Sequence, residues 1–300
     1  MRVSVIDPIN PAVERAKTLL FAPFDLGKWF VIGFCAWLAQ PGRFNGGLRV
    51  GDKFDEAKGY VSANLDWIIP LAITVFVLMI AIVLVMMWLS SRGRFMFLDC
   101  VARHKAHVRD PWHRFRMYAA SLFAFRVTVG IIGFAVMIAL ASAGGVFIWI
   151  SRASGFNAAS VLGLIVLGLL FVIITIVFAL IGIFTTDFVV PIMYLHTMSC
   201  TQAWRMLLDV LSWNQGRFIL YVLFQILLKV AIAALVMGVG CMTCCVGFCL
   251  MALPYIGTVI LLPIRVFERS YSAYYLAQYG PQFNVFTPRP EAPAAAEQPI

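Results

Sequence analysis

The stretch from Phe218 to Ile264 constrains the fold more than any other part of the chain. It runs for 47 residues and carries one formal charge, at Lys229. A hydrocarbon core about 30 Å thick needs about 20 apolar residues in a helix, because each residue adds about 1.5 Å of rise. The stretch is therefore long enough for two membrane spans joined by a turn, and one of them would hold a cation near its middle.

Three further uncharged stretches are long enough to cross a bilayer. They cover residues 67–89, 127–151 and 153–186, and each exceeds the threshold of about 18 residues for a transmembrane helix. A shorter one, 29–42, reaches span length only if residues from Thr18 onward contribute. The composition is 62% hydrophobic and 12% charged, against about 45–50% and 25% in soluble domains. The sequence predicts an all-α, polytopic bundle of six transmembrane helices.

The distribution of basic residues predicts the orientation of these spans. Lys and Arg are retained on the cytoplasmic side of a membrane. With six spans, 16 of the 23 Lys and Arg residues fall on the side of the two termini and five on the opposite side. We therefore expect a multi-pass protein with both termini in the cytoplasm. The net charge of +9 is assigned to this bias, and no nucleic-acid partner is expected.

Two segments have the pattern of amphipathic helices that lie at the cytoplasmic interface. Residues 9–22 place Val13, Ala16, Leu19 and Leu20 on one face, and residues 201–213 do the same with Trp204, Leu207, Leu208 and Leu211. Similar sequences open a span near Gly27, Arg114 and Gly216, which suggests three two-span repeats (8–110, 111–198 and 199–286). A basic residue beside an aromatic one is also common wherever a helix meets the interface, so both explanations stay open.

We expect residues 1–286 to form a single membrane domain. Residues 287–300 are rich in Pro, Ala, Glu and Gln. Such a composition cannot bury a core, and it predicts a disordered cytoplasmic tail.

Lys229 is the most informative single residue, because an ionisable side chain inside a span is costly and usually has a partner or a function. Gln225 lies one turn earlier on the same helical face, and Arg126 lies inside the third predicted span. Two explanations of Lys229 remain open. It pairs with Asp187 or Glu268 and fixes the packing of helices, or it binds a substrate together with Gln225 and Arg126. Arg126 could also extend to the interface, as long basic side chains do.

Segment 91–118 is the most basic part of the chain. Its seven cations are candidates for contact with anionic lipid headgroups: Arg92, Arg94, Arg103, Lys105, Arg109, Arg114 and Arg116. The same segment holds His104, His107 and His113 with Asp99 and Asp110, but attraction to lipids is the simpler explanation. We predict no metal site and no cofactor. The expected partners are membrane lipids and other membrane or cytoplasmic proteins.

Four cysteines, Cys241, Cys244, Cys245 and Cys249, form a C-x2-C-C-x3-C cluster. Their neighbours include no His or acidic residue that would complete a metal site. Reduced, bridged and metal-bound states therefore stay open. No P-loop, G-x-S-x-G or H-E-x-x-H motif occurs in the sequence, and no residues support an enzyme.

Two motifs carry a resemblance to a known family. They are Pro23–Phe30 (PFDLGKWF) and Phe267–Leu276 (FERSYSAYYL), the latter followed by Gly280 and Pro281. They resemble an uncharacterised family of prokaryotic multi-spanning membrane proteins. That family is distantly similar to the membrane domain of glycerophosphodiester phosphodiesterases, whose catalytic His-Arg-Gly motif does not occur here. The resemblance implies this fold and a prokaryotic cytoplasmic membrane, and it implies no activity.

Two hypotheses on function follow. The first is a non-enzymatic scaffold or accessory protein that engages lipids and partner proteins through its basic cytoplasmic face. The alternative is a transporter of an anionic or amphiphilic substrate that uses Lys229, Gln225 and Arg126. A polar cavity at Lys229 would favour the transporter, and dry packing would favour the scaffold.

Overall fold

The computed structural model describes residues 3–22, 24–40, 65–103, 109–153, 155, 157–242 and 254–286, and every regular element in these ranges is a helix. In chain order the elements are α1 (Ile9–Phe21), α2 (Leu26–Ala39), α4 (Leu65–Arg103), α5 (Arg109–Arg114), α6 (Arg116–Ala153), α7 (Ala158–Phe184), the π-helix η1 (Thr185–Val189), α8 (Val190–His196), α9 (Cys200–Trp213), α10 (Gln215–Met242), α12 (Pro254–Ile260), α13 (Leu262–Ala277) and the 3-10 helix η2 (Pro281–Phe283).

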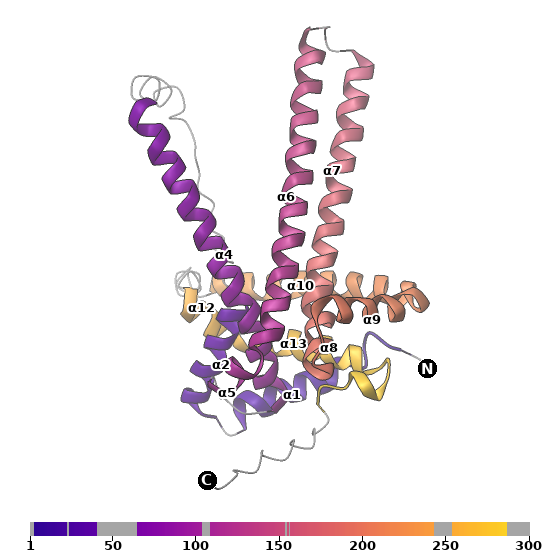
Figure 1. Ribbon diagram of the computed structural model, residues 1–300. Coiled ribbons are helices and arrows are strands. Elements are labelled where there is room, and N and C mark those ends of the chain that lie inside the picture. Colours follow the sequence, from indigo (N-terminus) through magenta and orange to yellow (C-terminus); the bar gives the residue numbers. More distant parts are fainter. Residues whose placement is uncertain are drawn as a thin grey trace.

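Three long helices, α4, α6 and α7, project from a base formed by the shorter helices and the 28-residue α10 (Figure 1). Within the described residues, four segments are long and apolar enough to cross a membrane: 69–103, 116–153, 158–196 and 215–242. Their large apolar side chains are widely exposed; Phe76 is 57% and Leu162 63% accessible. Apolar surface of this extent is not found on soluble monomers. The chain is therefore an all-α protein with four helices suited to a bilayer.

The two other predicted spans are not among these four. Helix α2 holds the first, but its 14 residues are fewer than the roughly 20 that a bilayer requires. The sixth ends near Ile264 and is described only from Pro254 onward, where α12 has seven residues; residues 243–253, in and beside the predicted turn before it, lie outside the described residues, as does the predicted tail at 287–300. The number of six spans thus stays a prediction.

The base holds two packed hydrophobic clusters. One is formed by α1, α2, α4 and α13 and includes Leu20, Ile32 and Met96. The other is rich in aromatic rings and joins η1 and α8 to α9, α10 and α13. In it the rings of Tyr221 and Tyr275 lie 4.5 Å apart between centroids. This second cluster holds the first half of α10, which runs across α6 and α7 in Figure 1 instead of alongside them.

The end of α2 lies directly on α4. The Ser90 hydroxyl donates a hydrogen bond to the Ala39 carbonyl oxygen over 2.9 Å, satisfying one of the last carbonyls of α2. One turn along α4, Gly93 has no side chain, and a Cβ there would lie 2.4 Å from the Leu38 carbonyl carbon. Gly93 therefore permits the close approach that brings α2 to the wall of the cavity described below.

Both predicted amphipathic segments are helices that bury one face. Helix α1 buries Ala12, Ala16, Leu19 and Leu20. Helix α9 buries Cys200, Ala203 and Leu207 and starts with a capping box, whereas Leu208, predicted on the apolar face, is 50% exposed. The buried faces of α1 and α9 pack against other helices of the base. A position of these two helices at the membrane interface stays a prediction.

Candidate functional site

A cavity of about 470 Å³ lies where α2, α4, α6, α10 and α13 meet the end of α7 and η1. This volume is within the range of about 300–1,000 Å³ of small-molecule sites. Its charged and polar wall consists of Gln40, Ser90, Arg94, Arg126, Thr186, Asp187, Gln225, Lys229, Arg265, Glu268 and Arg269. Five cations face two carboxylates, which leaves a formal excess of three positive charges.

The structure brings together all the site residues that the sequence predicted within spans or at their ends. Lys229, Gln225, Arg126, Asp187 and Glu268 come from four different parts of the chain, and all five line this cavity. The sequence offered two alternative groupings, Lys229 with an acidic residue or Lys229 with Gln225 and Arg126, and the cavity contains the residues of both.

Asp187 enters the cavity from the π-helical turn η1. The Val190 N–H bonds the Thr185 carbonyl, five residues back instead of four. Pro191 follows, and it has no N–H to give to the Asp187 carbonyl. Such π-turns are frequent at functional sites. The Tyr221 hydroxyl donates to the Asp187 carboxylate over 3.1 Å. Gln225 donates to the Tyr221 hydroxyl over 2.9 Å, so α10 orients the carboxylate.

Arg269 is the most buried cation of the cavity, with 7% of its surface exposed. One of its terminal nitrogens, Nη1, donates to the Thr186 carbonyl of η1. The other, Nη2, is buried and has no hydrogen-bond partner within the described part of the chain. Burial lowers the pKa of Arg269 to about 10, opposed by the carboxylate of Asp187. The side chain therefore remains a cation at neutral pH.

Arg94 and Arg126 form the opposite wall. Arg126 donates to the hydroxyls of Ser90 and Ser91, each over 3.2 Å, which ties α6 to α4. The Arg94 Nε is buried and, like Arg269 Nη2, has no hydrogen-bond partner among the residues that the structure describes. Arg94 was predicted to contact lipid headgroups, and its side chain faces this cavity. Its position on α4, directly next to Gly93 and the end of α2, accounts for the difference.

Lys229 lies on the exposed side of α10 and lines the cavity. The structure shows no ion pair between Lys229 and Asp187 or Glu268 in the described ranges. Asp187 instead accepts the hydrogen bond from Tyr221, and Glu268 pairs with Arg265 at 3.9 Å. Lys229 nevertheless lies close enough to Asp187 for electrostatic attraction, so a pairing of these two residues that fixes the packing of helices stays a prediction.

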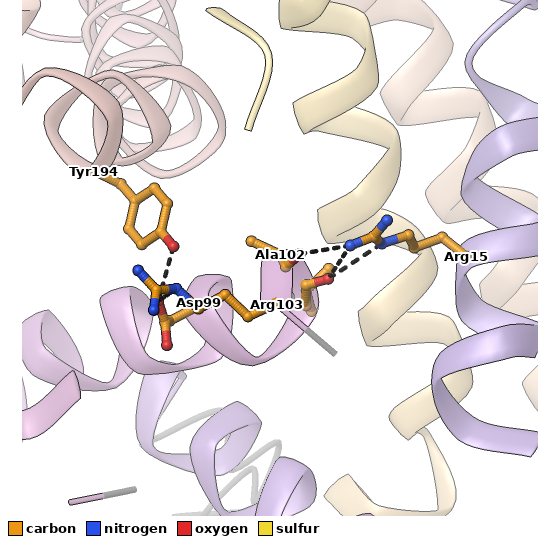
Figure 2. Close-up of polar contacts among 6 residues, drawn as sticks. Arg15, Asp99, Ala102, Arg103 and Tyr194 are labelled. Carbon is orange, nitrogen blue, oxygen red and sulfur yellow. Dashed lines mark hydrogen bonds and ion pairs between the residues drawn. The ribbon is translucent and has the colours of Figure 1, made fainter. Parts of the chain in front are cut away.

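A second polar cluster lies at the base, on α4 (Figure 2). The Tyr194 hydroxyl donates to the Asp99 carboxylate over 2.8 Å, and the Arg103 Nε pairs with the same oxygen over 3.1 Å. Arg15 donates to the carbonyl oxygens of Val101 and Ala102 at the end of α4. These contacts satisfy the end of α4 and join it to α1 and α8. We assign them a structural role.

The family comparison covers most of this architecture. A model of a family of unknown function (DUF7544) matches residues 3–253. The chain belongs to this family. No curated protein and no solved structure matches the chain. The matched DUF7544 segment includes α2, α4, α6, α7, η1 and α10 of the cavity, while Arg265, Glu268 and Arg269 on α13 follow its end.

The other predicted lipid contacts of this DUF7544 protein divide into two groups. Arg92 and Arg103 are engaged within the protein. Arg92 lies over the rings of Trp88 and Trp112 at 4.3 and 4.7 Å, and Arg103 pairs with Asp99. Arg114 and Arg116 are exposed beside the start of α6. Lys105 and the side chain of Arg109 lie outside the described residues.

The cysteine and histidine predictions are covered only in part. Cys241 is an exposed free thiol, while Cys244, Cys245 and Cys249 lie outside the described residues. Among the described side chains, no group of three His, Cys, Asp or Glu residues could hold a metal ion. His104 and His107 are again outside these ranges, so the three-histidine cluster is not covered.

Arg269 is the functional candidate that sequence reasoning missed. It lies in the motif FERSYSAYYL, which forms the buried helix α13. The available signal was an arginine next to serines and tyrosines in a segment that packs against apolar helices. It was not used, because the segment follows the last predicted span and was expected to be cytoplasmic and solvated.

Proposed function

We propose that the protein is an integral membrane transporter that binds an anionic substrate in the cavity between α4, α6, η1, α10 and α13. One observation carries this proposal. Arg94 Nε and Arg269 Nη2 are buried donors without a hydrogen-bond partner among the described residues, and both side chains line this cavity. An unsatisfied buried donor costs about 1–3 kcal/mol, and more when it is charged. Substrate oxygens that accept from these donors would offset this cost.

The composition of the wall indicates the charge of the substrate. Arginine presents several donors in a fixed plane that suits carboxylate and phosphate oxygens. With an excess of three positive charges, the cavity repels cations and attracts anions. Lys229, which forms no salt bridge with a described carboxylate, adds an exposed ammonium group to the lining.

The scaffold hypothesis receives less support from the same side chains. It required the basic residues of segment 91–118 to face the membrane surface or a partner. Arg94 instead lines the cavity, and Arg92 and Arg103 are engaged by Trp88 and Asp99 of the same helix. Of the seven, Arg114 and Arg116 have described, exposed side chains that suit such a surface.

We retain the six-span topology as part of the proposal. The base in Figure 1 carries the basic segments and would face the cytoplasm. The cavity would then lie toward the cytoplasmic side of a prokaryotic inner membrane. We also keep, as a proposal from the two sequence motifs alone, a distant similarity to the membrane domain of glycerophosphodiester phosphodiesterases, which would imply this topology and no activity.

The proposal is tested by anion binding to the intact protein in phosphatidylcholine nanodiscs, with inorganic phosphate as the probe. Lys229→Gln and Arg126→Gln each remove one charged donor, worth about 1.5–3 kcal/mol. We expect each to weaken phosphate binding by about tenfold or more. Arg205→Gln, at an exposed position on α9, is the matched control and should bind as the wild type does.

Equal phosphate affinity in all four proteins would refute the cavity as the site. Transport is measured in a separate experiment, in proteoliposomes with labelled phosphate trapped inside. Release should be slower with Lys229→Gln than with Arg205→Gln.

A further inference from the structure

A second cavity, also of about 470 Å³, adjoins the first. It lies between α4, α6 and the last turns of α7. Its wall is almost wholly apolar: Met87, Phe125, Val129, Gly130, Gly133, Phe134, Met137, Phe178, Ile181 and Gly182, with Thr175, Thr185, Arg94 and Arg126. We refer to it as the apolar cavity and to the first as the cationic cavity.

The two cavities share part of their walls. Arg94, Arg126 and Gly182 line both of them. The guanidinium group of Arg126 is held in place by Ser90 and Ser91. Along α7 and η1, residues 179, 183 and 186 face the cationic cavity and residues 175, 178 and 185 the apolar one. Adjacent faces of one helix thus join a charged compartment to an apolar compartment, with arginines at the junction.

This juxtaposition indicates the shape and chemistry of the ligand. An anionic group alone would use only the cationic cavity, and a hydrocarbon alone would leave the buried donors of Arg94 and Arg269 without acceptors. A molecule with an anionic head and an apolar tail satisfies both compartments. We propose that the substrate is an anionic amphiphile of the membrane, whose head lies between Arg94, Arg126 and Arg269 and whose tail lies between α6 and α7.

The glycines of α6 give this inference a steric test. A Cβ at Gly130 would meet no atom within 4 Å, and Gly130 lines the apolar cavity. A leucine at this position would therefore occupy space that the tail requires without displacing protein atoms near the backbone. Gly145, on the same helix, is equally open but does not line the cavity. Gly130→Leu and Gly145→Leu form a matched pair.

The inference rests on the proposed function, and three probes separate the two: inorganic phosphate, dodecyl phosphate and dodecanol. Binding is measured to the full chain in phosphatidylcholine nanodiscs, with partition into empty nanodiscs subtracted. We expect Gly130→Leu to weaken dodecyl phosphate binding by about tenfold. This factor corresponds to a cost of about 1–2 kcal/mol for placing extra side-chain volume in the site. The same variant should leave inorganic phosphate binding unchanged, and Gly145→Leu should leave both unchanged.

Each other outcome identifies which proposal fails. If dodecyl phosphate binds equally to wild type and to Gly130→Leu, while Lys229→Gln still weakens inorganic phosphate binding, the tail site is refuted and the anion site stands. If dodecanol binds as tightly as dodecyl phosphate, the cationic cavity does not select the head and the amphiphile is refuted. If neither phosphate probe binds the wild type, the proposed function itself fails.

Discussion

Substitution of Gly93 by alanine tests the packing that forms one wall of the cationic cavity. A Cβ at this position would lie 2.4 Å from the Leu38 carbonyl carbon and 2.6 Å from the Ala39 nitrogen. These are backbone atoms, which cannot rotate away as a side chain could. Helix α2 would have to move off α4, and the hydrogen bond from Ser90 to Ala39 would lengthen.

The magnitude follows from two opposing effects. Overpacking a well-filled contact costs about 1–3 kcal/mol, and the backbone contact places Gly93→Ala at the upper end. Alanine in place of glycine inside a helix recovers about 1 kcal/mol. We therefore expect Gly93→Ala to lower the free energy of unfolding by about 2 kcal/mol.

The control is Gly168→Ala on α7, where a Cβ would meet nothing within 4 Å. This variant keeps only the helix-propensity gain and should be as stable as the wild type or slightly more stable. Both variants are compared by the midpoint of unfolding in mixed micelles, followed by tryptophan fluorescence. A Gly93→Ala protein at least as stable as Gly168→Ala would refute the close approach of α2 and α4.

Three further predictions concern the base. Tyr194→Phe leaves one oxygen of Asp99 without the hydroxyl donor and should lower stability by about 1 kcal/mol, measured by the same unfolding midpoint. Maleimide should label the exposed Cys241 in the folded protein and should not label the buried Cys200. A thiol reacts as the thiolate, and burial raises the pKa of Cys200 to about 12. Rapid labelling of Cys200 would contradict its burial. Burial also raises the pKa of Tyr271, so above about pH 9 the unfolded chain loses protons that the folded chain keeps. The free energy of unfolding should therefore fall as pH rises. In Cys200→Ala it should fall less steeply, because this variant lacks one of the groups whose pKa is raised by burial.

The sequence predicted the helical class and most of the long helices, because this information is local. The run 153–186 contains no charged residue and is longer than a bilayer requires. The structure places most of it in α7 and η1. The charge at Arg152 and the cap at Asn157 mark the connection between α6 and α7. The first and sixth spans were harder to predict. The first corresponds to α2, and a helix of 14 residues is compatible with several positions relative to the membrane.

The residues of the candidate site were predictable in part. Lys229, Arg126 and Asp187 were identified because a charge in or beside an apolar helix is unusual wherever it lies. Arg94 was identified only as a candidate for lipid headgroups and Arg269 was not identified, because each lies in a segment with other charged and polar residues. Their burial depends on which helices cover them, and composition does not contain that information.

The sequence by itself thus determined that the chain belongs in a membrane as an all-α protein and which charges are costly to bury there. Only the tertiary structure decided that Lys229, Asp187 and Glu268 line one cavity, that Arg94 lines the same cavity, and that Arg269 donates to the Thr186 carbonyl at a π-turn. The physical reason is the distance along the chain over which each effect acts. Hydrophobicity and helix formation act over one or two turns of the chain, whereas a cavity depends on contacts between residues as distant as Gln40 and Arg269.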